Sequence, residues 1–379
     1  MKVPFFDLAR QFEKIRKEIT MSLEEVFQTQ QFILGPQVSE LETMIARYCD
    51  VSFAIGVASG SDALFLALLA LGVGPGDEVI LPSFTFFATA GAVSRTGAKP
   101  VFADIDPATY NIDPEELKKR ISSQTKAVIP VHLYGQCADM DPILDLCTIR
   151  SIFVIEDAAQ ALGAVYEPEG TSFPRKAGQM GILGCFSFFP TKNLGAFGDA
   201  GMIVTDRNEL AERLRILRVH GSHPKYYHKW IGINSRLDTI QAAILKAKLP
   251  HLERWTEERR RKAKRYEELL GNLFSSLPGA ALPKTQFRNR HIYNQYVIRV
   301  PQRDQLRAFL QEQGVGTEIY YPVPLHLQQC YAFLHYREGD LPHSEKAAKE
   351  VLALPIYPEL TDEEQDYVVD QIRRFYDNL

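Results

Sequence analysis

One lysine and one aspartate in this sequence could together do chemistry. Lys192 lies in a glycine-containing turn directly after the aromatic run of residues 186–189, and Asp157 ends the apolar run of residues 152–156. A partly desolvated lysine has a lowered pKa and can form a Schiff base with an aldehyde. An aspartate at the end of a buried strand can hold a pyridine nitrogen protonated. Such a pair suggests pyridoxal phosphate as the cofactor.

Each of the two residues also has a plainer interpretation. Alone, Asp157 could cap a helix, and Lys192 could be an ordinary solvated side chain. The neighbouring Ser187 and Asn193, with the glycines at 195, 198 and 201, suit a constrained backbone close to a ligand. We therefore favour a cofactor role for the window around Lys192.

A phosphate could bind at residues 58–63, Ala-Ser-Gly-Ser-Asp-Ala, which lie between an expected strand and an expected helix. Exposed amides and the dipole at a helix N-terminus attract phosphate, and a glycine such as Gly60, next to Ser61, permits close approach. An ordinary helix cap explains the segment equally well. The sequence contains no G-x-x-x-x-G-K-[ST] nucleotide loop.

Two further windows hold candidate ligand contacts. Phe86, within the aromatic-rich residues 82–89, could stack on a flat ring, although aromatic side chains at such positions usually belong to the core. Arg236, in residues 232–243, could bind a carboxylate in bidentate fashion. Without further context, Asn234 and Arg236 are residues at the start of a helix.

These candidates must be positioned by a larger framework. From about residue 50 to 205, short apolar runs alternate with helical patterns, which predicts a mostly parallel sheet with helices on both faces. Ligands of such sheets bind beyond the carboxyl ends of the strands, where Asp157 and residues 59–62 are expected.

The pattern changes near residue 250. We expect a large cofactor-binding domain over residues 1–250 and a smaller α+β domain over residues 251–379. The expected elements of the second domain are a charged helix over 252–270, strands over 293–300 and 316–321, and helices over 304–313 and 361–378.

Composition narrows the class of protein. The 379 residues are 45% hydrophobic and carry a net charge of −4, which favours neither nucleic acid nor an anionic membrane as partner. Five scattered cysteines, and the lack of a signal peptide or a membrane-spanning run, indicate a cytoplasmic protein. The basic run at residues 259–264 is interrupted nearby by glutamates and predicts a solvated helix face. His220, His223 and His228 have no acidic or cysteine neighbour, so we expect no metal site.

The windows occur in the order typical of a known family. Over nearly its whole length the sequence resembles the DegT/DnrJ/EryC1/StrS family of sugar aminotransferases. The segments that carry the resemblance are 32–36 (Phe-Ile-Leu-Gly-Pro), 104–107 (Asp-Ile-Asp-Pro), 132–136 (His-Leu-Tyr-Gly-Gln), 156–160 (Glu-Asp-Ala-Ala-Gln) and 354–358 (Leu-Pro-Ile-Tyr-Pro). The resemblance implies the α/β type I fold of pyridoxal-phosphate-dependent aminotransferases, with a mostly parallel seven-stranded sheet. It also implies a homodimer whose active sites lie at the subunit interface.

The resemblance further implies a role for each matching residue. Lys192 would form the Schiff base with the cofactor and move the substrate proton, and Asp157 would pair with the pyridine nitrogen. The other implied roles are Gln160 near the phenolic oxygen, Phe86 stacked on the ring, Gly60, Ser61 and Ser187 on the phosphate with Asn234 of the other subunit, Arg236 of the other subunit on a substrate carboxylate, and Tyr320 and Tyr321 along the sugar pocket.

The implied reaction transfers an amino group from L-glutamate to a keto group of a dTDP- or UDP-linked sugar, for cell-surface polysaccharides or related amino sugars. His220 and residues 234–238 resemble the subgroup that aminates 3-oxo sugars, including UDP-linked 3-oxo uronates. Tyr320 stands where the uronate enzymes carry histidine, so the sugar, the nucleotide and the ketone position stay open. The role of the loop from His220 to Trp230 is also open.

Two other functions are possible for such a chain. A sugar dehydratase of the same family would carry histidine in place of the cofactor lysine, and this chain retains Lys192. A non-catalytic regulatory protein would be expected to lose Lys192 or Asp157, and both are present.

Overall fold

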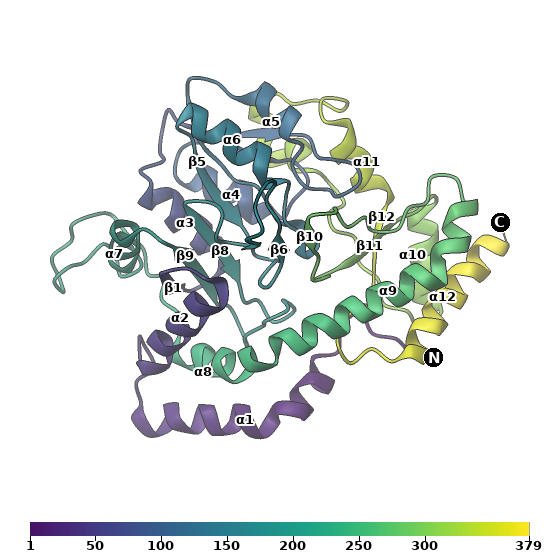
Figure 1. Cartoon of the computed structure of the whole chain (residues 1–379), viewed down its shortest axis with the longest axis horizontal. Coiled ribbons are helices and arrows are strands. Elements are labelled where there is room, and N and C mark those ends of the chain that lie inside the picture. Colours follow the sequence, from purple (N-terminus) through teal and green to yellow (C-terminus); the bar gives the residue numbers. More distant parts are fainter. Residues whose placement is uncertain (379) are drawn as a thin grey trace.

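A seven-stranded sheet forms the centre of the molecule, of which the computed structural model describes residues 1–378 (Figure 1). In spatial order its strands are β1 (Phe53–Val57), β9 (Gly201–Thr205), β8 (Leu183–Ser187), β5 (Phe153–Asp157), β4 (Thr125–Val128), β2 (Glu78–Pro82) and β3 (Lys99–Ala103). Strand β9 runs antiparallel to both neighbours, and the remaining pairs are parallel. The expected mostly parallel seven-stranded sheet is confirmed.

Helices cover both faces of this sheet, because its strands are apolar on both sides. Strands β2 and β9 are buried over their full length, as expected for central strands of a two-sided sheet. One face packs against α2 (Pro36–Cys49), α5 (Pro114–Arg120), α6 (Met140–Arg150) and α8 (Thr239–Lys248). The other packs against α3 (Gly60–Ala70), α4 (Phe87–Arg95) and α7 (Asn208–Leu217).

The C-terminal part has a hydrophobic cluster of its own. It is built on α9 (Leu252–Ser276), β11 (Tyr296–Arg299), α10 (Arg303–Glu312), β12 (Val351–Leu354) and α12 (Asp362–Asp377). Between β11 and β12 the chain returns to the large sheet, where Leu325, Tyr331 and Leu341 join the cluster under α3 and α4. The domain boundary expected at residue 250 stays a prediction.

Two further helices and several short elements complete the chain. They are α1 (Leu8–Thr29), α11 (Pro342–Glu350), the small sheet of β6 (Val165–Tyr166), β7 (Arg175–Lys176) and β10 (Asn289–Arg290), and the 3₁₀ turns Leu133–Gly135, Leu249–His251, Leu325–Leu327 and Gln329–Leu334.

The prediction of a strand over residues 316–321 is wrong. Only Glu318 forms a bridge, with Ala353, and the strand that pairs with β11 is β12. The run Val351-Leu-Ala-Leu354 is apolar throughout and lies next to a helix, so periodicity alone did not separate it from helix.

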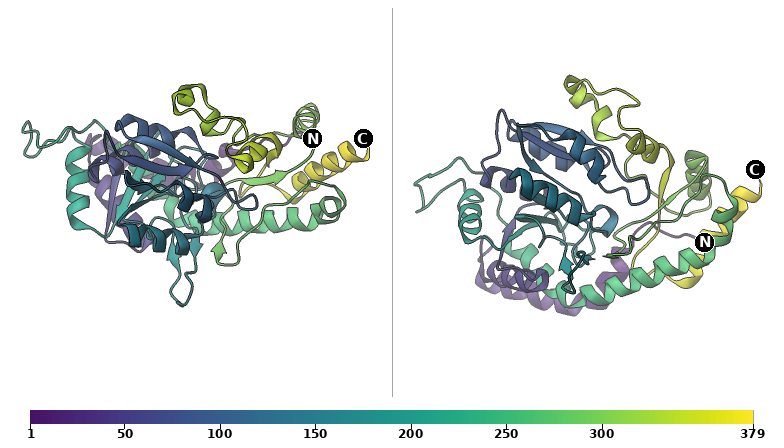
Figure 2. Two further views of the ribbon diagram at one scale, coloured as in Figure 1. Left: turned by 90° about the horizontal axis from the view of Figure 1, so that it is seen from above. Right: turned by 45° about the horizontal axis from the view of Figure 1, so that its top comes forward.

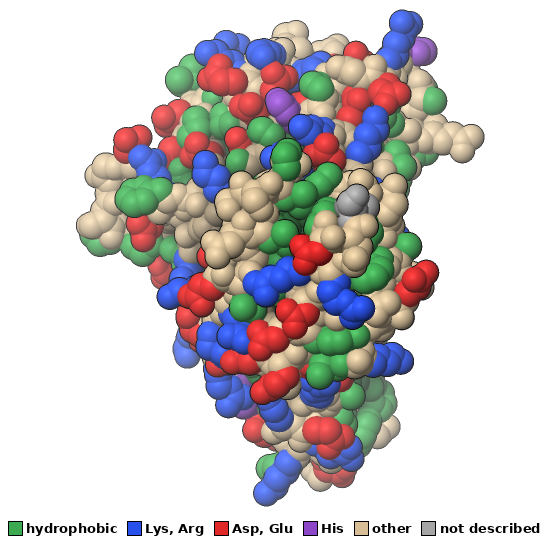
Figure 3. Space-filling view, turned by 90° about the vertical axis from the view of Figure 1, so that its right-hand side faces the viewer, with side chains coloured by type: hydrophobic (Ala, Val, Ile, Leu, Met, Phe, Trp, Pro, Cys, Tyr) green, Lys and Arg blue, Asp and Glu red, His purple; other side chains and the backbone are tan. Residues whose placement is uncertain are grey.

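The basic run of α9 also differs from its expected solvated face. Arg260 pairs with Glu257 at the surface, but Arg259 is 5% exposed and donates to the Ile356 oxygen at 2.7 Å. Lys262 is 2% exposed and reaches Asp362 at 2.6 Å. One side of this helix is buried because it packs on the C-terminal cluster. Figure 3 shows the end of the molecule formed by these elements, where basic and acidic side chains are interspersed.

Helix α1 connects the two parts of the chain. It packs along α8 on one side, and Arg10 at its start pairs with Glu364 of α12 at 2.7 Å. Figure 2 shows the long helix α9 (green) leading from the large sheet to the C-terminal part, where it lies beside α12 (yellow). Through these contacts, α1 joins α12 of the C-terminal part to α8 of the large sheet.

Thr361 caps α12 and offers a test of this arrangement. Its hydroxyl accepts from the Glu364 amide at 3.1 Å, and the Glu364 carboxylate accepts from the Thr361 amide at 2.9 Å. We expect Thr361→Ala to lower the free energy of unfolding by about 1 kcal/mol, as measured by urea denaturation. The exposed Thr43→Ala in α2 is the control. Equal stability of the two variants would contradict the capping role.

Candidate active site

The sequence candidates gather where strands of the sheet end. Asp157 is the last residue of β5, Ser187 is the last residue of the neighbouring β8, and Phe86 follows β2 as the residue before α4. Because β2, β4, β5 and β8 are parallel, their carboxyl ends meet at one edge. This edge is where ligands bind in open α/β sheets.

Asp157 is a buried carboxylate with few protein partners. It is 5% exposed, and its oxygens accept from the Thr89 hydroxyl at 2.7 Å and the Ala159 amide at 3.2 Å. Burial raises the pKa of Asp157, while these hydrogen bonds and the charge of Lys192 act in the opposite direction. A cation placed against Asp157 would satisfy the carboxylate.

Lys192 lies in the turn after β8 and contributes an amine to this edge. Its backbone N–H donates to the Phe189 oxygen at 2.9 Å, which holds the turn closed. Burial lowers the pKa of Lys192 to about 8, and the charge of Asp157 raises it. At neutral pH a sizeable fraction of the amine, about a tenth, is therefore unprotonated and nucleophilic.

An anion site is formed by the start of α3. Ser59 caps the helix by accepting from the Asp62 amide at 3.1 Å, and the amides of Gly60 and Ser61 belong to the first turn, which has no intrahelical acceptors. A Cβ on Gly60 would lie 2.6 Å from the Cβ of Ser187. Glycine at position 60 therefore lets the helix start approach the end of β8.

Gln160 links Asp157's loop to the tyrosine segment. Its Oε1 accepts from the Tyr134 amide at 2.7 Å, and its Nε2 donates to the Tyr321 hydroxyl at 3.1 Å. The Tyr134 hydroxyl in turn donates to the Tyr320 carbonyl oxygen. Residues of three distant segments are thereby tied to one wall of the site.

The aromatic run after β2 divides into core and site. Phe84 is fully buried, whereas Phe86 is 58% exposed, with its ring centroid 6.2 Å from that of Tyr321. Phe86 therefore does not serve the core and leaves an apolar face open beside the tyrosine, as a stacking partner for a flat ring would.

Asn234 and Arg236 make no hydrogen bond to this group within the described part of the chain. Asn234 is exposed and bridges to Val219, and the intervening Ser235 accepts from the Ala58 amide at 3.1 Å. Arg236 has a buried Nε with no hydrogen-bond partner in the described residues. Within the described residues no hydrogen bond or ion pair joins either residue to Lys192, and their action from a second subunit stays a prediction.

Two residues of the site escaped the sequence analysis. Thr89 holds Asp157, and Tyr134 holds both Gln160 and the Tyr320 carbonyl. The spacing of Phe86 and Thr89 was the available signal for Thr89, because residues three apart share a helix face. The partners of Tyr134 lie far away in sequence, so no local pattern indicates its role.

Glu156, next to Asp157, serves the framework. It is fully buried, accepts from the Gly178, Met180 and Gly181 amides at 2.5–2.7 Å, and contacts His132 Nε2 at 2.7 Å. The Ala138 amide donates to His132 Nδ1, so the proton of the neutral ring is on Nε2 and is donated to Glu156. Successive strand residues point to opposite faces, which separates the roles of the two carboxylates.

Two negative findings concern the described part of the chain. Over residues 1–378, no three His, Cys, Asp or Glu side chains gather in a cluster suited to a metal ion. In the same range no helix is long and apolar enough to cross a bilayer.

The residues at this edge fit pyridoxal phosphate. They provide an amine of lowered pKa for the aldehyde, a buried carboxylate for the pyridinium, a helix N-terminus for the phosphate and an exposed aromatic face for the ring. A type I α/β sheet with this set of groups defines a pyridoxal-phosphate-dependent aminotransferase.

Comparison with known proteins identifies the family. The sequence matches the DegT/DnrJ/EryC1/StrS aminotransferase family over residues 13–373, and the chain belongs to this family. Its cofactor is pyridoxal 5′-phosphate. A crystal structure of Streptomyces venezuelae DesV in complex with a ketimine intermediate superposes with a TM-score of 0.93 at 43% identity, covering 99% of this chain and 98% of DesV.

Three relatives illustrate the range of named functions. A pleiotropic regulatory protein of Geobacillus stearothermophilus is 54% identical, with 99% of each chain covered. The dTDP-3-amino-3,4,6-trideoxy-α-D-glucose transaminase of Streptomyces venezuelae is 43% identical, over 100% of this chain and 97% of that one. The UDP-N-acetyl-3-dehydro-α-D-glucosamine 3-aminotransferase of Acidithiobacillus ferrooxidans is 44% identical, over 98% and 97%.

The lowered pKa of Lys192 can be measured without the cofactor. Because only the neutral amine reacts, reductive methylation of Lys192 by formaldehyde and borohydride should accelerate about tenfold per pH unit and level off near pH 8. In Asp157→Asn the midpoint should move to lower pH, because the carboxylate that raises the pKa is gone. Mass spectrometry of the modified peptide gives both rates.

The exposed Lys264 of α9 serves as internal control in the same samples. A midpoint for Lys192 equal to that of Lys264, or one that Asp157→Asn moves to higher pH, would contradict the account.

Proposed function

We propose that the protein transfers the amino group of L-glutamate to the C3 keto group of a nucleotide-linked sugar. The observation that carries this function is the half-buried Lys192, with its lowered pKa, beside the buried Asp157 at the carboxyl edge of the type I sheet. Transfer at C3 is supported by two relatives named for a 3-amino and a 3-dehydro sugar. Since these relatives are similarly distant and differ in nucleotide, dTDP and UDP are both candidates.

The bound cofactor supplies the electron sink for this chemistry. Asp157 keeps the ring nitrogen protonated, because its carboxylate is buried and would otherwise lack a charged partner. The Thr89 hydroxyl orients the Asp157 carboxylate by donating a hydrogen bond to its Oδ2. Removal of either residue should weaken the first half of the reaction more than binding of the sugar.

Lys192 moves the substrate proton. With glutamate bound to the cofactor, the free Lys192 amine would take the proton from Cα of glutamate and later release it. A base with a pKa of about 8 is matched to this task near neutral pH, because it can both accept and release the proton.

The remaining wall positions the reactants. Gln160 is held by the Tyr134 amide and by Tyr321, and it would contact the phenolic oxygen of the cofactor. Phe86 would stack on the ring, and Tyr320 and Tyr321, whose rings contact each other, would line the sugar pocket. These aromatic side chains exclude water from the reacting atoms.

A homodimer with shared sites completes the proposal. Asn234 would join the phosphate site of the partner, and Arg236 would contact a carboxylate of the substrate there. The proposal is supported by the exposed position of Asn234 and by the Arg236 side chain, whose Nε has no hydrogen-bond partner in the described residues. An arginine of this kind has donors left for a planar carboxylate.

A regulatory function is the second candidate, because the relative with 54% identity carries that name. A purely regulatory chain needs neither an amine of lowered pKa nor a buried carboxylate against it. Both are built into this chain, which favours the enzyme.

The visible absorption spectrum tests the reaction. The purified protein with pyridoxal phosphate should show the band of the lysine-bound cofactor, and excess glutamate should convert it to the pyridoxamine form. Lys192→Ala should abolish the band. Addition of dTDP- or UDP-linked 3-oxo sugars should then restore the band in wild type. No band in wild type would reopen the regulatory function, and a band that ignores glutamate would exclude glutamate as donor.

The shared site can be tested by mixing two inactive variants. Lys192→Ala and Arg236→Ala should each lose turnover, but co-expression should restore up to about a quarter of wild-type activity, because half of the dimers then hold one intact site. The double variant Lys192→Ala/Arg236→Ala, co-expressed with wild type, is the matched control. No restoration in the mixture would show that both residues act within one subunit.

A further inference from the structure

A second lysine of lowered pKa, Lys248, lies outside the residues assigned to the reaction. It is the last residue of α8 and only 3% exposed. Its ammonium donates to the Gly195 carbonyl oxygen at 2.6 Å and lies 5.3 Å from the centre of the Phe197 ring. Burial lowers the pKa of Lys248 to about 8. A lysine is rarely buried in this way, because desolvation of its charge costs free energy, so the position calls for an explanation.

The acceptor of this hydrogen bond belongs to the turn that carries Lys192. The turn closes through the bond from the Lys192 amide to the Phe189 oxygen and the bond from the Ala196 amide to the Phe188 oxygen, both at 2.8–2.9 Å. A Cβ at Gly195 would lie 2.2 Å from the Pro190 oxygen, so the two ends of the turn are in direct contact. Movement of Gly195 therefore displaces the backbone of Lys192.

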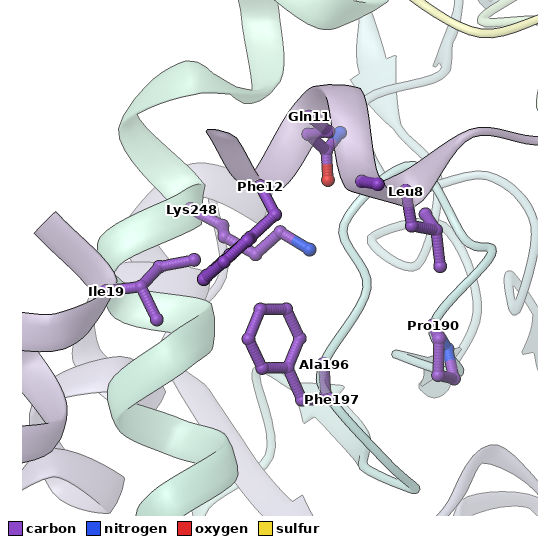
Figure 4. Close-up of a pocket in the computed structure, with 9 residues that line it drawn as sticks. Leu8, Gln11, Phe12, Ile19, Pro190, Ala196, Phe197 and Lys248 are labelled. Atoms are coloured by element: carbon purple, nitrogen blue, oxygen red, sulfur yellow. The ribbon is translucent and has the colours of Figure 1, made fainter. Parts of the chain in front are cut away.

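The outer side of this turn faces a cavity. A cavity of about 370 Å³ separates it from α1 and α8, lined by Leu8, Ala9, Gln11, Phe12, Ile19, Pro190, Ala196, Phe197 and Lys248. Figure 4 shows the Lys248 side chain crossing from α8 to end between Phe12 and the turn. The rings of Phe12 and Phe197 meet at 5.8 Å. Two side chains of α8 contact the backbone of this turn: Gln241 Oε1 accepts from the Phe197 amide at 2.8 Å, and the Lys248 amine donates to the Gly195 oxygen, nearer to Lys192.

We propose that Lys248 is a positioning residue for the aminotransferase reaction, which fixes Gly195 and thereby the direction in which Lys192 presents its amine. The inference rests on the proposed role of Lys192. In this proposal α8, which contributes no residue to the reaction itself, helps to hold the turn that carries Lys192.

Loss of the Lys248 hydrogen bond should slow the reaction, because proton transfer needs the Lys192 amine in a precise position. Without the donor, the Gly195 oxygen loses its hydrogen bond beside the cavity, and the turn can shift toward that space. A displacement of about 1 Å at a reacting group lowers rates by up to about a hundredfold. The loss should fall on the rate constant, because Lys248 contacts neither glutamate nor the sugar.

Two measurements on Lys248→Met test the proposal. In the cofactor-free protein, hydrogen–deuterium exchange over residues 189–197 should accelerate about tenfold, while exchange in the sheet stays unchanged. In the loaded enzyme, the rate of the glutamate half-reaction should fall at least about tenfold with the KM for glutamate little changed. Lys248→Gln, which is too short to reach Gly195, should behave alike and replaces Lys248→Met where that variant does not fold.

The control is Lys246→Met, on the same helix, whose amine pairs with Glu40 at the surface. It should exchange and react as wild type does. Wild-type exchange over residues 189–197 in a folded Lys248→Met or Lys248→Gln would overturn the proposal, as would an equal acceleration across the whole sheet. The exchange result does not need glutamate, so it separates this proposal from the proposed function: inactive wild type refutes only the latter.

Discussion

A buried carboxylate and a partly buried amine control the active edge of this protein. Burial raises the pKa of Asp157 and lowers that of Lys192, so each group is pushed toward its neutral form and neither fully satisfies the other. A pyridinium ring with an aldehyde provides the cation that Asp157 lacks and the electrophile that Lys192 can attack. The site is therefore incomplete in the protein alone and complete with its cofactor.

The framework keeps this pair in place through buried polar contacts. Glu156 closes the loop that precedes β8 with three backbone amides, while Thr89 at the first turns of α4 fixes the Asp157 carboxylate. On the other side of the Lys192 turn, Lys248 bonds to Gly195. Parallel strands supply the common edge, and helices on both faces supply the dry surroundings that shift the two pKa values.

The sequence was informative where chemistry is local. The sheet with its alternating strands and helices, the start of α3 and the window around Lys192 have short-range patterns, and the structure has these elements. It was uninformative where partners are distant in the chain: Tyr134 bonds to residues 160 and 320, and Arg259 is buried by packing against the C-terminal part. The strand expected over 316–321 failed because an apolar run of four residues elsewhere, β12, took the place beside β11.

The protonation state of the bound ring nitrogen tests the central claim most directly. Nitrogen NMR of the enzyme loaded with ¹⁵N-pyridoxal phosphate should give the shift of a protonated pyridine in wild type and of a neutral one in Asp157→Ala, over a pH range in which the free cofactor titrates. A neutral ring in the wild-type enzyme, or a protonated ring that persists in Asp157→Ala, would contradict the assignment of Asp157 and with it the account of the site.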